Sequence, residues 1–282
     1  MAMSSHGIKR KVTIEIIVVG NELLNGTTLD TNSHWISKRL EKIGAFLSRK
    51  TTIEDDLQAI SDTLREAFRR RPNWIVTIGG LGPTFDDMTL SGVAAAVHTD
   101  IERNPLAVSY LRESYKRRRM QAKRLPSASL KMAEIPKGAV PLLNSVGSAP
   151  GVLLDHEQIR IVSLPGIPSE MKAIFEEQVE PRILEEIGHG SVKSKQLWIE
   201  TIGVRESLIA PATKRIMDKY QNDIYLKSHP MGFDKKHRSI IHFQLILENA
   251  TQKGNLSFHN ASKELRKAIS KYGIAQRERI IS

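Results

Sequence analysis

The stretch that decides the fold is "TIGGLGPTFDD", Thr77 to Asp87, in which three glycines within four residues precede two adjacent acids. It follows the apolar run "WIV", Trp74 to Val76, as the loop after a buried strand would. Glycine lets a phosphate approach backbone N–H groups closely. Carboxylates beside a phosphate would repel it unless a hard divalent cation lies between them. The stretch therefore predicts a phosphate-binding loop with a divalent metal (Mg²⁺, Mn²⁺ or Co²⁺) or a carboxylate that acts as a base.

Strand and helix patterns alternate on both sides of this stretch. Such alternation predicts an α/β fold with a mostly parallel sheet covered on both faces. The last helix is expected to kink near Pro181, because proline cannot donate a backbone hydrogen bond. Strands are expected at 11–20, 46–53 and 73–80, a hairpin at 151–166, and helices at 30–44, 55–70, 89–97, after Asn104 and at 169–188.

A second domain follows a glycine- and serine-containing linker at 188–194. The patterns beyond the linker predict a smaller α+β domain of the order βαββα. The expected elements are strands at 195–203, 223–228 and 238–249 and helices at 204–220 and 256–273. We therefore expect an α/β domain over residues 1–187 and the smaller domain over residues 195–282.

Composition bounds the class of protein. The 282 residues include no cysteine, so disulfides and thiolate chemistry are excluded. The N-terminus lacks the apolar segment of a signal peptide, and no apolar run is long enough to span a bilayer, so we expect a cytoplasmic protein. The net charge of +11 gathers in Arg112–Arg124 and Lys263–Arg279. A solvated basic face is the commoner meaning of such segments, and nucleic-acid contact is the alternative.

Four loops that follow predicted strands carry the candidate site residues. The carboxyl ends of parallel strands share one edge of a sheet, and ligands bind there where the strand order reverses. The loops are 20–26, 54–56, 77–87 and 164–171, and they would bring Glu22, Asp55, Asp56, Asp86 and Asp87 close to glycine backbone. Structural alternatives stay open, because Asp55 or Asp56 could cap the next helix and Glu22 could be a solvated loop acid.

Five motifs occur in the order and approximate spacing of one family. They are "GNELLNGTTLDTN", "GGLGPTFDDMT", "NSVGSAPG", "SLPGIPSEM" and "IGVRES". The chain resembles the CinA family over nearly its whole length. The resemblance implies a three-layer molybdopterin-binding-type (MoCF) domain with a nucleotide or pterin site at its glycine loops, followed by the smaller α+β domain. Larger members carry a further domain that deamidates nicotinamide mononucleotide, and that activity is not expected here.

The resemblance also implies roles for individual residues. Related domains that bind or adenylylate molybdopterin use an Asp of a "GGTG…RD" motif and another Asp after the second strand. The matching positions are Asp87 and Asp55. This sequence departs from that pattern with Leu81 in place of the Thr and Asp86 in place of the Arg. Members of the CinA type, which share "GGLGPT.DD", have been assigned metal-dependent hydrolysis of ADP-ribose to AMP and ribose 5-phosphate.

The main hypothesis is therefore a metal-dependent ADP-ribose pyrophosphatase that forms a homodimer. Asp55 and Asp87 would be catalytic, and Asp55, Asp86 and Asp87 would hold the metal. The expected substrate contacts are Gly20, Asn21, Glu22, Gly79, Gly80, Leu81, Gly82, Pro83, Thr84, Asn144, Pro165 and Gly166.

Two alternatives remain. The first is a molybdopterin-binding protein without hydrolase activity. The second is nucleic-acid binding by the smaller domain, which resembles KH-like modules. Because that domain lacks a "GxxG" loop, nucleic acid is not the expected partner.

Overall fold

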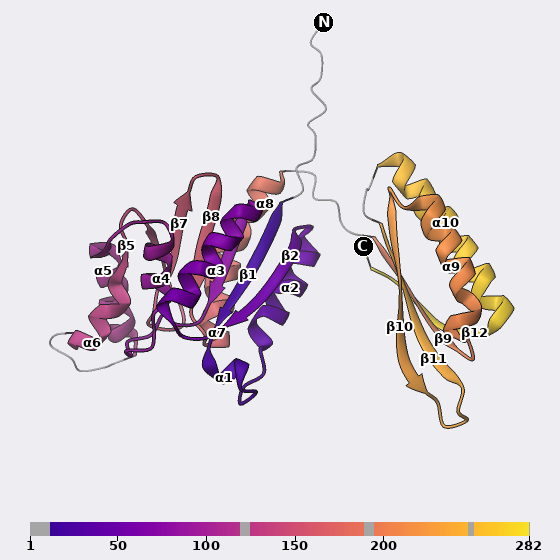
Figure 1. Ribbon diagram of the computed structural model, residues 1–282, viewed down its shortest axis with the longest axis horizontal. Coiled ribbons are helices and arrows are strands. Elements are labelled where there is room, and N and C mark those ends of the chain that lie inside the picture. Colours follow the sequence, from indigo (N-terminus) through magenta and orange to yellow (C-terminus); the bar gives the residue numbers. More distant parts are fainter. Residues whose placement is uncertain (1–11, 119–124, 189–194, 248–250, 282) are drawn as a thin grey trace, which may run out of the picture. The chain divides into compact units, whose positions relative to one another are not determined.

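The computed structural model describes residues 12–118, 125–188, 195–247 and 251–281 (Figure 1). The chain forms two compact units, Met1–Ser191 and Val192–Ser282. Each unit has its own hydrophobic core. None of the described helices has the length and apolarity that a bilayer span requires.

A six-stranded sheet forms the centre of the first unit. Its strand order is β2-β1-β3-β8-β7-β6. The first four strands are parallel, and β7 and β6 are antiparallel to their neighbours. This confirms the predicted mostly parallel sheet. The strands are β1 (Thr13–Val19), β2 (Phe46–Ile53), β3 (Trp74–Ile78), β6 (Val140–Leu142), β7 (Gly151–His156) and β8 (Ile159–Leu164).

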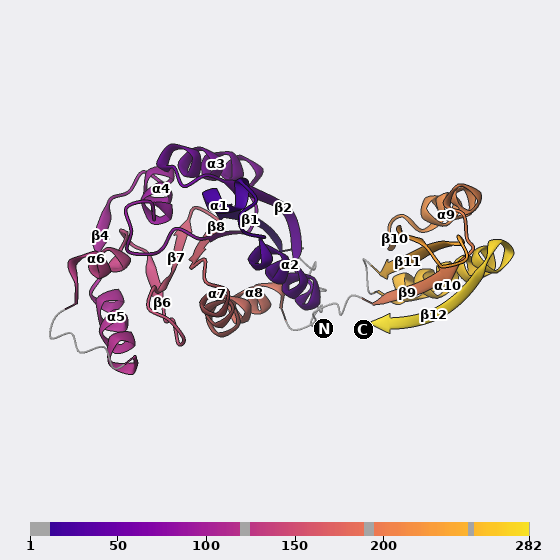
Figure 2. The same ribbon diagram turned by 90° about the horizontal axis from the view of Figure 1, so that it is seen from below.

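Helices cover both faces of this sheet, as Figure 2 shows. The helices α2 (Thr31–Ile43), α7 (Pro168–Ile174) and α8 (Glu180–Ile187) pack on one face. The other face is covered by α3 (Leu57–Arg70), α4 (Thr89–Ala96) and α5 (Pro105–Arg117). Because both faces are covered, β1 and β3 are apolar and buried almost throughout. The first unit therefore has three layers.

The helix ends follow the capping residues of the sequence. The Asp30 side chain accepts a hydrogen bond from Ser33 N (2.9 Å), and Gly44 ends α2 with a φ of 81°. A π-helical segment, Phe175–Val179, separates α7 from α8, and Pro181 lies at the start of α8. The disruption near Pro181 that the sequence predicts is therefore present as a π segment.

Several short elements of the first unit have no counterpart in the sequence prediction. Each has only three or four residues, too few to produce a recognisable periodicity. They are α1 (Asn21–Leu24), β4 (Ile101–Arg103), α6 (Ser127–Leu130), a 3₁₀ turn (Lys131–Ala133), β5 (Glu134–Pro136) and β6.

The second unit is a four-stranded antiparallel sheet with two helices. Its strand order is β10-β11-β9-β12. Apolar side chains of both helices pack with those of the strands in one core. The elements are β9 (Gln196–Ile202), α9 (Glu206–Tyr220), β10 (Ile224–Phe233), β11 (Ser239–Leu247), α10 (Gln252–Tyr272) and β12 (Ile274–Ile281).

The predicted order βαββα is wrong, because the final strand β12 was missed. All residues of β12 are exposed, so its sequence "IAQRERII" lacks the alternation that marks a half-buried strand. β12 forms the edge of the sheet and pairs only with β9 among the described strands. The observed order βαββαβ is that of a ferredoxin-like domain and not of a KH-like one.

Candidate functional site

A cleft of about 600 Å³ lies at the carboxyl ends of β1, β3 and β8. β1 lies between β2 and β3, so the chain leaves β1 toward one side and later returns to its other side. This reversal is the topological position at which open α/β sheets bind ligands. The structure therefore brings the predicted loops together where the sequence placed them.

Most of the predicted site residues line this cleft. The loop after β3 contributes an unbroken stretch of its wall. The predicted residues in the lining are Glu22, Asp55, Gly79, Gly80, Leu81, Gly82, Pro83, Thr84, Asp86, Asp87, Pro165 and Gly166.

The glycines of the loop are required by the protein's own packing. Gly79 has a φ of 100°, and a Cβ there would lie 2.3 Å from the Val19 carbonyl oxygen at the end of β1. Gly80 has a φ of 67°, and its Cβ would meet Thr89 Oγ1 at 2.3 Å. Both backbone conformations favour glycine. The protein's own packing is therefore sufficient to require these glycines, and their contact with a ligand stays a prediction.

The loop still has backbone donors to offer. Gly79 N donates to the Leu164 carbonyl (2.9 Å), which ties the loop to the end of β8. Among the described residues, no hydrogen bond uses the N–H of Gly80, Leu81 or Gly82. Three successive unpaired N–H groups in a cleft can bind a phosphate.

Asp87 closes the turn that follows the glycines. Its Oδ2 accepts hydrogen bonds from Thr84 N (2.8 Å) and from the Thr84 hydroxyl (2.5 Å). A Cβ on Gly82 would lie 2.5 Å from the same oxygen, so glycine is also needed there. Asp87 therefore shapes the loop, and its other carboxylate oxygen has no hydrogen-bond partner among the described residues.

The carboxyl group of Asp86 is stabilised in its charged form. The Thr84 side chain, a backbone N–H and the nearby Lys131 ammonium hold the pKa of the Asp86 carboxyl below its ordinary value. Lys131 also donates to the Thr84 carbonyl. The Lys131 cation therefore lies beside Asp86, the acid that stands in place of the arginine of the "GGTG…RD" motif.

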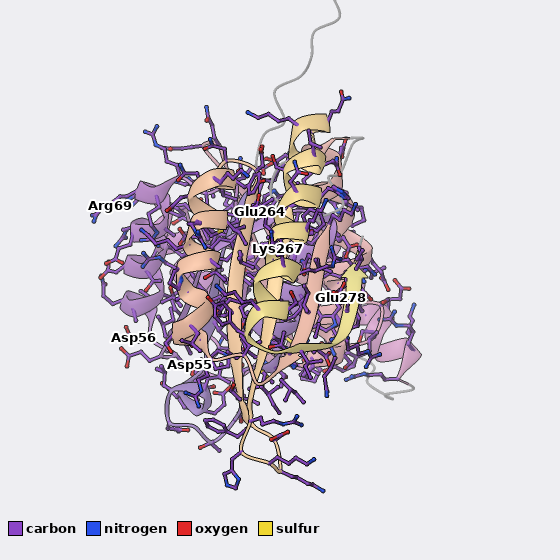
Figure 3. All side chains as sticks on the ribbon, turned by 90° about the vertical axis from the view of Figure 1, so that its right-hand side faces the viewer. Asp55, Asp56, Arg69, Glu264, Lys267 and Glu278 are labelled. Atoms are coloured by element: carbon purple, nitrogen blue, oxygen red, sulfur yellow. The ribbon has the colours of Figure 1, made fainter. Side chains whose placement is uncertain are left out.

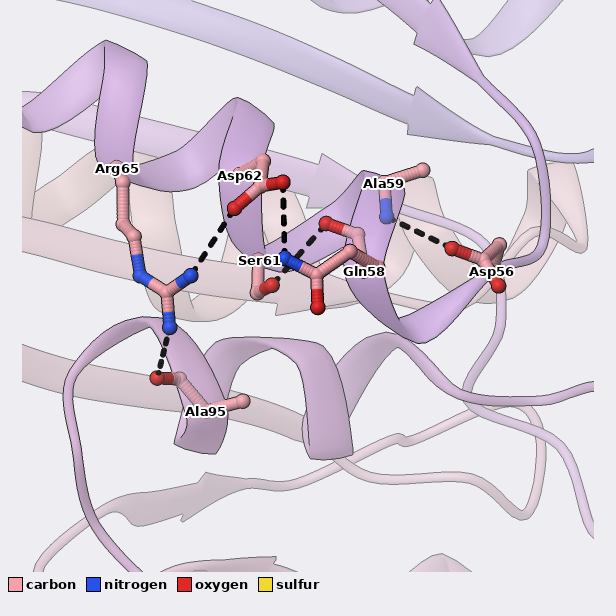
Figure 4. Close-up of polar contacts among 7 residues, drawn as sticks. All are labelled: Asp56, Gln58, Ala59, Ser61, Asp62, Arg65 and Ala95. Atoms are coloured by element: carbon pink, nitrogen blue, oxygen red, sulfur yellow. Dashed lines mark hydrogen bonds and ion pairs between the residues drawn. The ribbon is translucent and has the colours of Figure 1, made fainter.

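Asp55 and Asp56 lie in different surroundings and have different hydrogen-bond partners. Asp55 lines the cleft, and its Oδ2 accepts a hydrogen bond from Asn21 N (2.8 Å). Asp56 caps α3 by accepting from Ala59 N (2.8 Å), as Figure 4 shows. It is absent from the lining of the cleft. The capping role that the sequence left open for either acid therefore belongs to Asp56, and both acids are labelled in Figure 3.

The acids do not form a metal site by themselves. Within the described parts of the chain, no group of three or more His, Asp or Glu side chains is placed to hold a metal ion. Asp55, Asp86 and Asp87 share the cleft but do not converge on one point. A divalent cation would need oxygen atoms of the ligand as well, as Mg²⁺ often does with phosphates.

Three of the predicted contacts are not in the cleft lining: Gly20, Asn21 and Asn144. Asn144 is only 3% exposed. Its Nδ2 donates to the Ala149 carbonyl (2.8 Å) and to Glu170 Oε2 (2.6 Å), and its Oδ1 accepts from Val146 N (3.1 Å) and Gly147 N (2.6 Å). All four hydrogen-bonding positions of the amide are used. Asn144 therefore shapes the loop behind the cleft, and the base or ribose contact expected of it stays a prediction.

The sequence missed other lining residues. Arg118 lines the cleft and donates through Nη1 to Ser148 Oγ (3.3 Å). It lies in the basic segment that was interpreted as a solvated face. That segment's Arg112 and Lys116 are indeed exposed, whereas Arg119 and Lys123, expected on the same helical face, fall outside the described residues.

Asn32 is the most informative of the missed residues. Its Nδ2 donates to the Gly166 carbonyl (2.6 Å), which fixes the orientation of the amide. Its Oδ1 is buried and has no hydrogen-bond partner among the described residues. A buried acceptor without a donor is costly, so a ligand N–H or a water is expected to satisfy it. Asn32 belongs to the quoted motif "GNELLNGTTLDTN", which was the available signal.

Comparison with known proteins places the chain in a family. The family model described as "Probable molybdopterin binding domain" matches residues 15–185. The chain belongs to this molybdopterin-binding-domain family. The matched region ends inside the first unit, so the family accounts for the sheet and the cleft.

Two curated relatives are similar to this chain over more residues than the family model matches. A protein of Sulfurisphaera tokodaii is 38% identical over 218 residues, covering 77% of this chain and 80% of the relative. A protein of Saccharolobus islandicus is 35% identical over 257 residues, covering 91% and 94%. The latter alignment includes most of the second unit as well.

A solved structure supports the CinA-like fold of the first unit. The protein CinA of unknown function from Thermoplasma acidophilum is 34% identical, with a TM-score of 0.55. The alignment covers 60% of this chain and 98% of that protein. This molybdopterin-binding-domain protein is therefore CinA-like, as the motifs indicated.

Proposed function

We propose that the cleft of the first unit binds molybdopterin, a pterin that carries a phosphate. The observation that carries the proposal is the unpaired Asn32 Oδ1 in the same cleft as the glycine loop. Such an acceptor suits an N–H group of a pterin ring. The description of the matching family, a probable molybdopterin binding domain, supports the same ligand class.

The donors and acceptors that line the cleft suit the two parts of this ligand. The free N–H groups of Gly80 to Gly82 and the Arg118 guanidinium suit the phosphate, because both are donors to anions. Asn32 suits the ring. The carboxylates of Asp55, Asp86 and Asp87 oppose binding of an anion, and Arg118 and Lys131 offset part of this repulsion.

Titration under anaerobic conditions tests this proposal. Purified protein should bind molybdopterin saturably, with inorganic phosphate as a weak competitor. AMP and ADP-ribose are the comparison ligands, since they offer phosphates with a different ring. Absence of saturable molybdopterin binding would overturn the proposal, and tighter binding of AMP or ADP-ribose would replace the pterin with a nucleotide.

Replacing Arg118 by alanine should weaken binding of the phosphorylated ligand by about tenfold or more. A charge-assisted hydrogen bond to a phosphate contributes about 1.5–3 kcal/mol. Arg112→Ala is the matched control, because Arg112 is an exposed arginine of α5, the helix that Arg118 caps, and does not line the cleft. Equal losses in both variants would mean that only the general positive charge matters and would remove Arg118 from the site.

Hydrolysis of ADP-ribose is a second candidate, favoured by the three aspartates that line the cleft beside the glycine loop. The substrate's diphosphate would have to supply the oxygen ligands that the chain lacks for a divalent cation. The cation would then stabilise charge on the phosphates. Incubation with ADP-ribose and Mg²⁺, Mn²⁺ or Co²⁺, with EDTA in a parallel sample, should yield AMP only where metal is present. No AMP with any of the three metals would leave the cleft as a binding site.

If AMP forms, Asp87→Asn should reduce turnover by about 10²-fold, because an amide neither binds a cation strongly nor accepts a proton. Thr84→Val is the control for the loop, since it removes the hydroxyl that Asp87 accepts from but keeps the carboxylate. A similar loss in both variants would indicate that Asp87 acts only by shaping the loop. Chromatography of AMP over time provides the rates.

A further inference from the structure

The sheet of the second unit has one face packed against its helices and an opposite face without them. Leu197, Phe243 and Leu245 belong to the core shared with α9 and α10. Side chains alternate along a strand, so their neighbours in the strands lie on the opposite face. Figure 3 views the helical side, where α9 and α10 lie in front of the strands. We call the opposite side the open face.

Two neighbouring rows of residues cross all four strands on the open face. The first row is Lys227, Gln244, Trp198 and Arg279, and the second is His229, His242, Glu200 and Arg277. Each row begins and ends on the edge strands β10 and β12. Trp198 and His242 therefore lie on the two central strands, and His229 lies on the edge strand β10. Cations lie on the edge strands, where Arg279 is paired with Glu200 (3.3 Å).

The aromatic rings are held in a defined arrangement. The Trp198 and His229 rings stack with centroids 5.2 Å apart at 25°, although β11 lies between their strands. His229 Nε2 and Gln244 Oε1 are 3.0 Å apart, and Gln244 Nε2 donates to Gln196 Oε1 (3.0 Å). Trp198 Nε1 also donates to Gln196 Oε1 (3.2 Å). Because these polar atoms are paired beneath the rings, little side-chain entropy is left to lose on binding.

Further exposed rings and cations surround this pair. Tyr225 on β10 is 44% exposed and lies opposite Ile246, next to the row of Lys227. Phe233, near the tip of the β10–β11 hairpin, is 73% exposed. Lys227, Arg277, and Lys235 and Lys236 in the hairpin are exposed, and none of these four forms an ion pair with another described residue.

The helical side of the unit is also basic but does not combine exposed aromatic rings with unpaired cations. Its two tyrosine rings, Tyr220 and Tyr272, are each covered by a neighbouring lysine at 5.0 Å and 5.4 Å. Lys219 and Arg266 are paired with Glu264 and Glu278. Uncovered aromatic rings and unpaired cations occur together on the open face.

We propose that the open face binds single-stranded nucleic acid. Unstacked bases would stack on the Trp198–His229 pair and on Tyr225, and the phosphates would contact Lys227 and Arg277. A four-stranded sheet with aromatic rings on its face is a known arrangement for single strands, and it needs no "GxxG" loop. The expectation that nucleic acid is not a partner depended on that missing loop and on a domain order without β12. RNA and single-stranded DNA share the required chemistry.

Fluorescence anisotropy of the full chain with labelled oligonucleotides tests this inference. The probes are a mixed-sequence single-stranded RNA, the same sequence as DNA, and its DNA duplex. We expect saturable binding of a single strand that weakens with added salt, and at least about tenfold weaker binding of the duplex. The tighter of the two single strands identifies the natural class. No retention of either strand at low salt, or duplex binding of equal strength, would overturn the proposal.

Matched variants separate the open face from general positive charge. Lys227→Glu with Arg277→Glu should weaken binding by about tenfold or more, because two phosphate contacts are lost. Lys263→Glu with Lys267→Glu makes the same change of charge at exposed positions of α10, where Figure 3 labels Lys267, and should have a much smaller effect. Equal losses in the two double variants would contradict the proposal.

Substitution of the rings tests stacking. Tyr225→Ala should weaken binding by about fivefold or more. Because Tyr225 is exposed, the substitution should leave folding intact. Trp198→Ala should do the same, while Trp198→Phe, which keeps a ring, should restore most of the affinity. Unchanged affinity in both alanine variants, with their circular dichroism spectra intact, would remove the aromatic platform.

Discussion

Replacing Gly79 by alanine should lower the free energy of unfolding of the first unit by about 4 kcal/mol. The φ of 100° lies outside the ordinary range of L-residues, and the added Cβ would lie 2.3 Å from the Val19 carbonyl oxygen. Both the φ angle and the contact with the carbonyl oxygen belong to the backbone, so no side-chain rotation can relieve the clash. Urea unfolding in a Trp198→Phe background, where the fluorescence comes from Trp35 and Trp74 alone, measures the change in this unit.

Gly138→Ala is the control for the contribution of the backbone conformation alone. Gly138 has a φ of 84°, and a Cβ there would have no atom within 4 Å. Gly138→Ala should therefore lower the free energy of unfolding by about 1 kcal/mol. If both variants lost the same free energy, the close approach to β1 would not be the reason for glycine at 79. Ligand binding by the Gly79 variant should also fall, because the loop that lines the cleft must move.

Asn144→Leu should lower the free energy of unfolding of the first unit by about 3 kcal/mol. The substitution leaves the Glu170 carboxylate, the Ala149 carbonyl and the Gly147 N–H without their partner in a site that is 3% exposed. Unpaired buried polar groups cost about 1–3 kcal/mol each, partly recovered as water enters. The loop is tightly closed, since a Cβ on Gly147 would lie 1.9 Å from Glu170 Cδ. The same urea unfolding measures the effect.

The neighbouring Ser145→Ala is the control for Asn144. Ser145 donates to Glu177 Oε1 (2.8 Å) at an exposed position, so its loss should cost well under 1 kcal/mol. A ligand contact at Asn144 would behave differently, because affinity would fall while stability stayed unchanged. That result would restore the role that the sequence suggested for Asn144 and contradict the structural one.

Much of the first unit follows from local sequence. The apolar run of β1 and the Asp30 and Gly44 signals of α2 could be recognised because propensity and capping act over a few residues. The position of the cleft also followed, since parallel strands that alternate with helices bring their carboxyl ends to one edge. The edge strand β12 could not be recognised, because an exposed strand carries no hydrophobic alternation.

The sequence by itself determined the alternation of strands and helices and the loops that form the cleft, because both depend on short-range patterns. Only the tertiary structure decided what each polar residue does. Asp55 faces the cleft whereas the adjacent Asp56 caps a helix, and Asn144 is buried whereas Arg118 reaches the site. The physical reason is that the role of a polar group depends on which partners lie within hydrogen-bonding distance, and those partners come from distant parts of the chain.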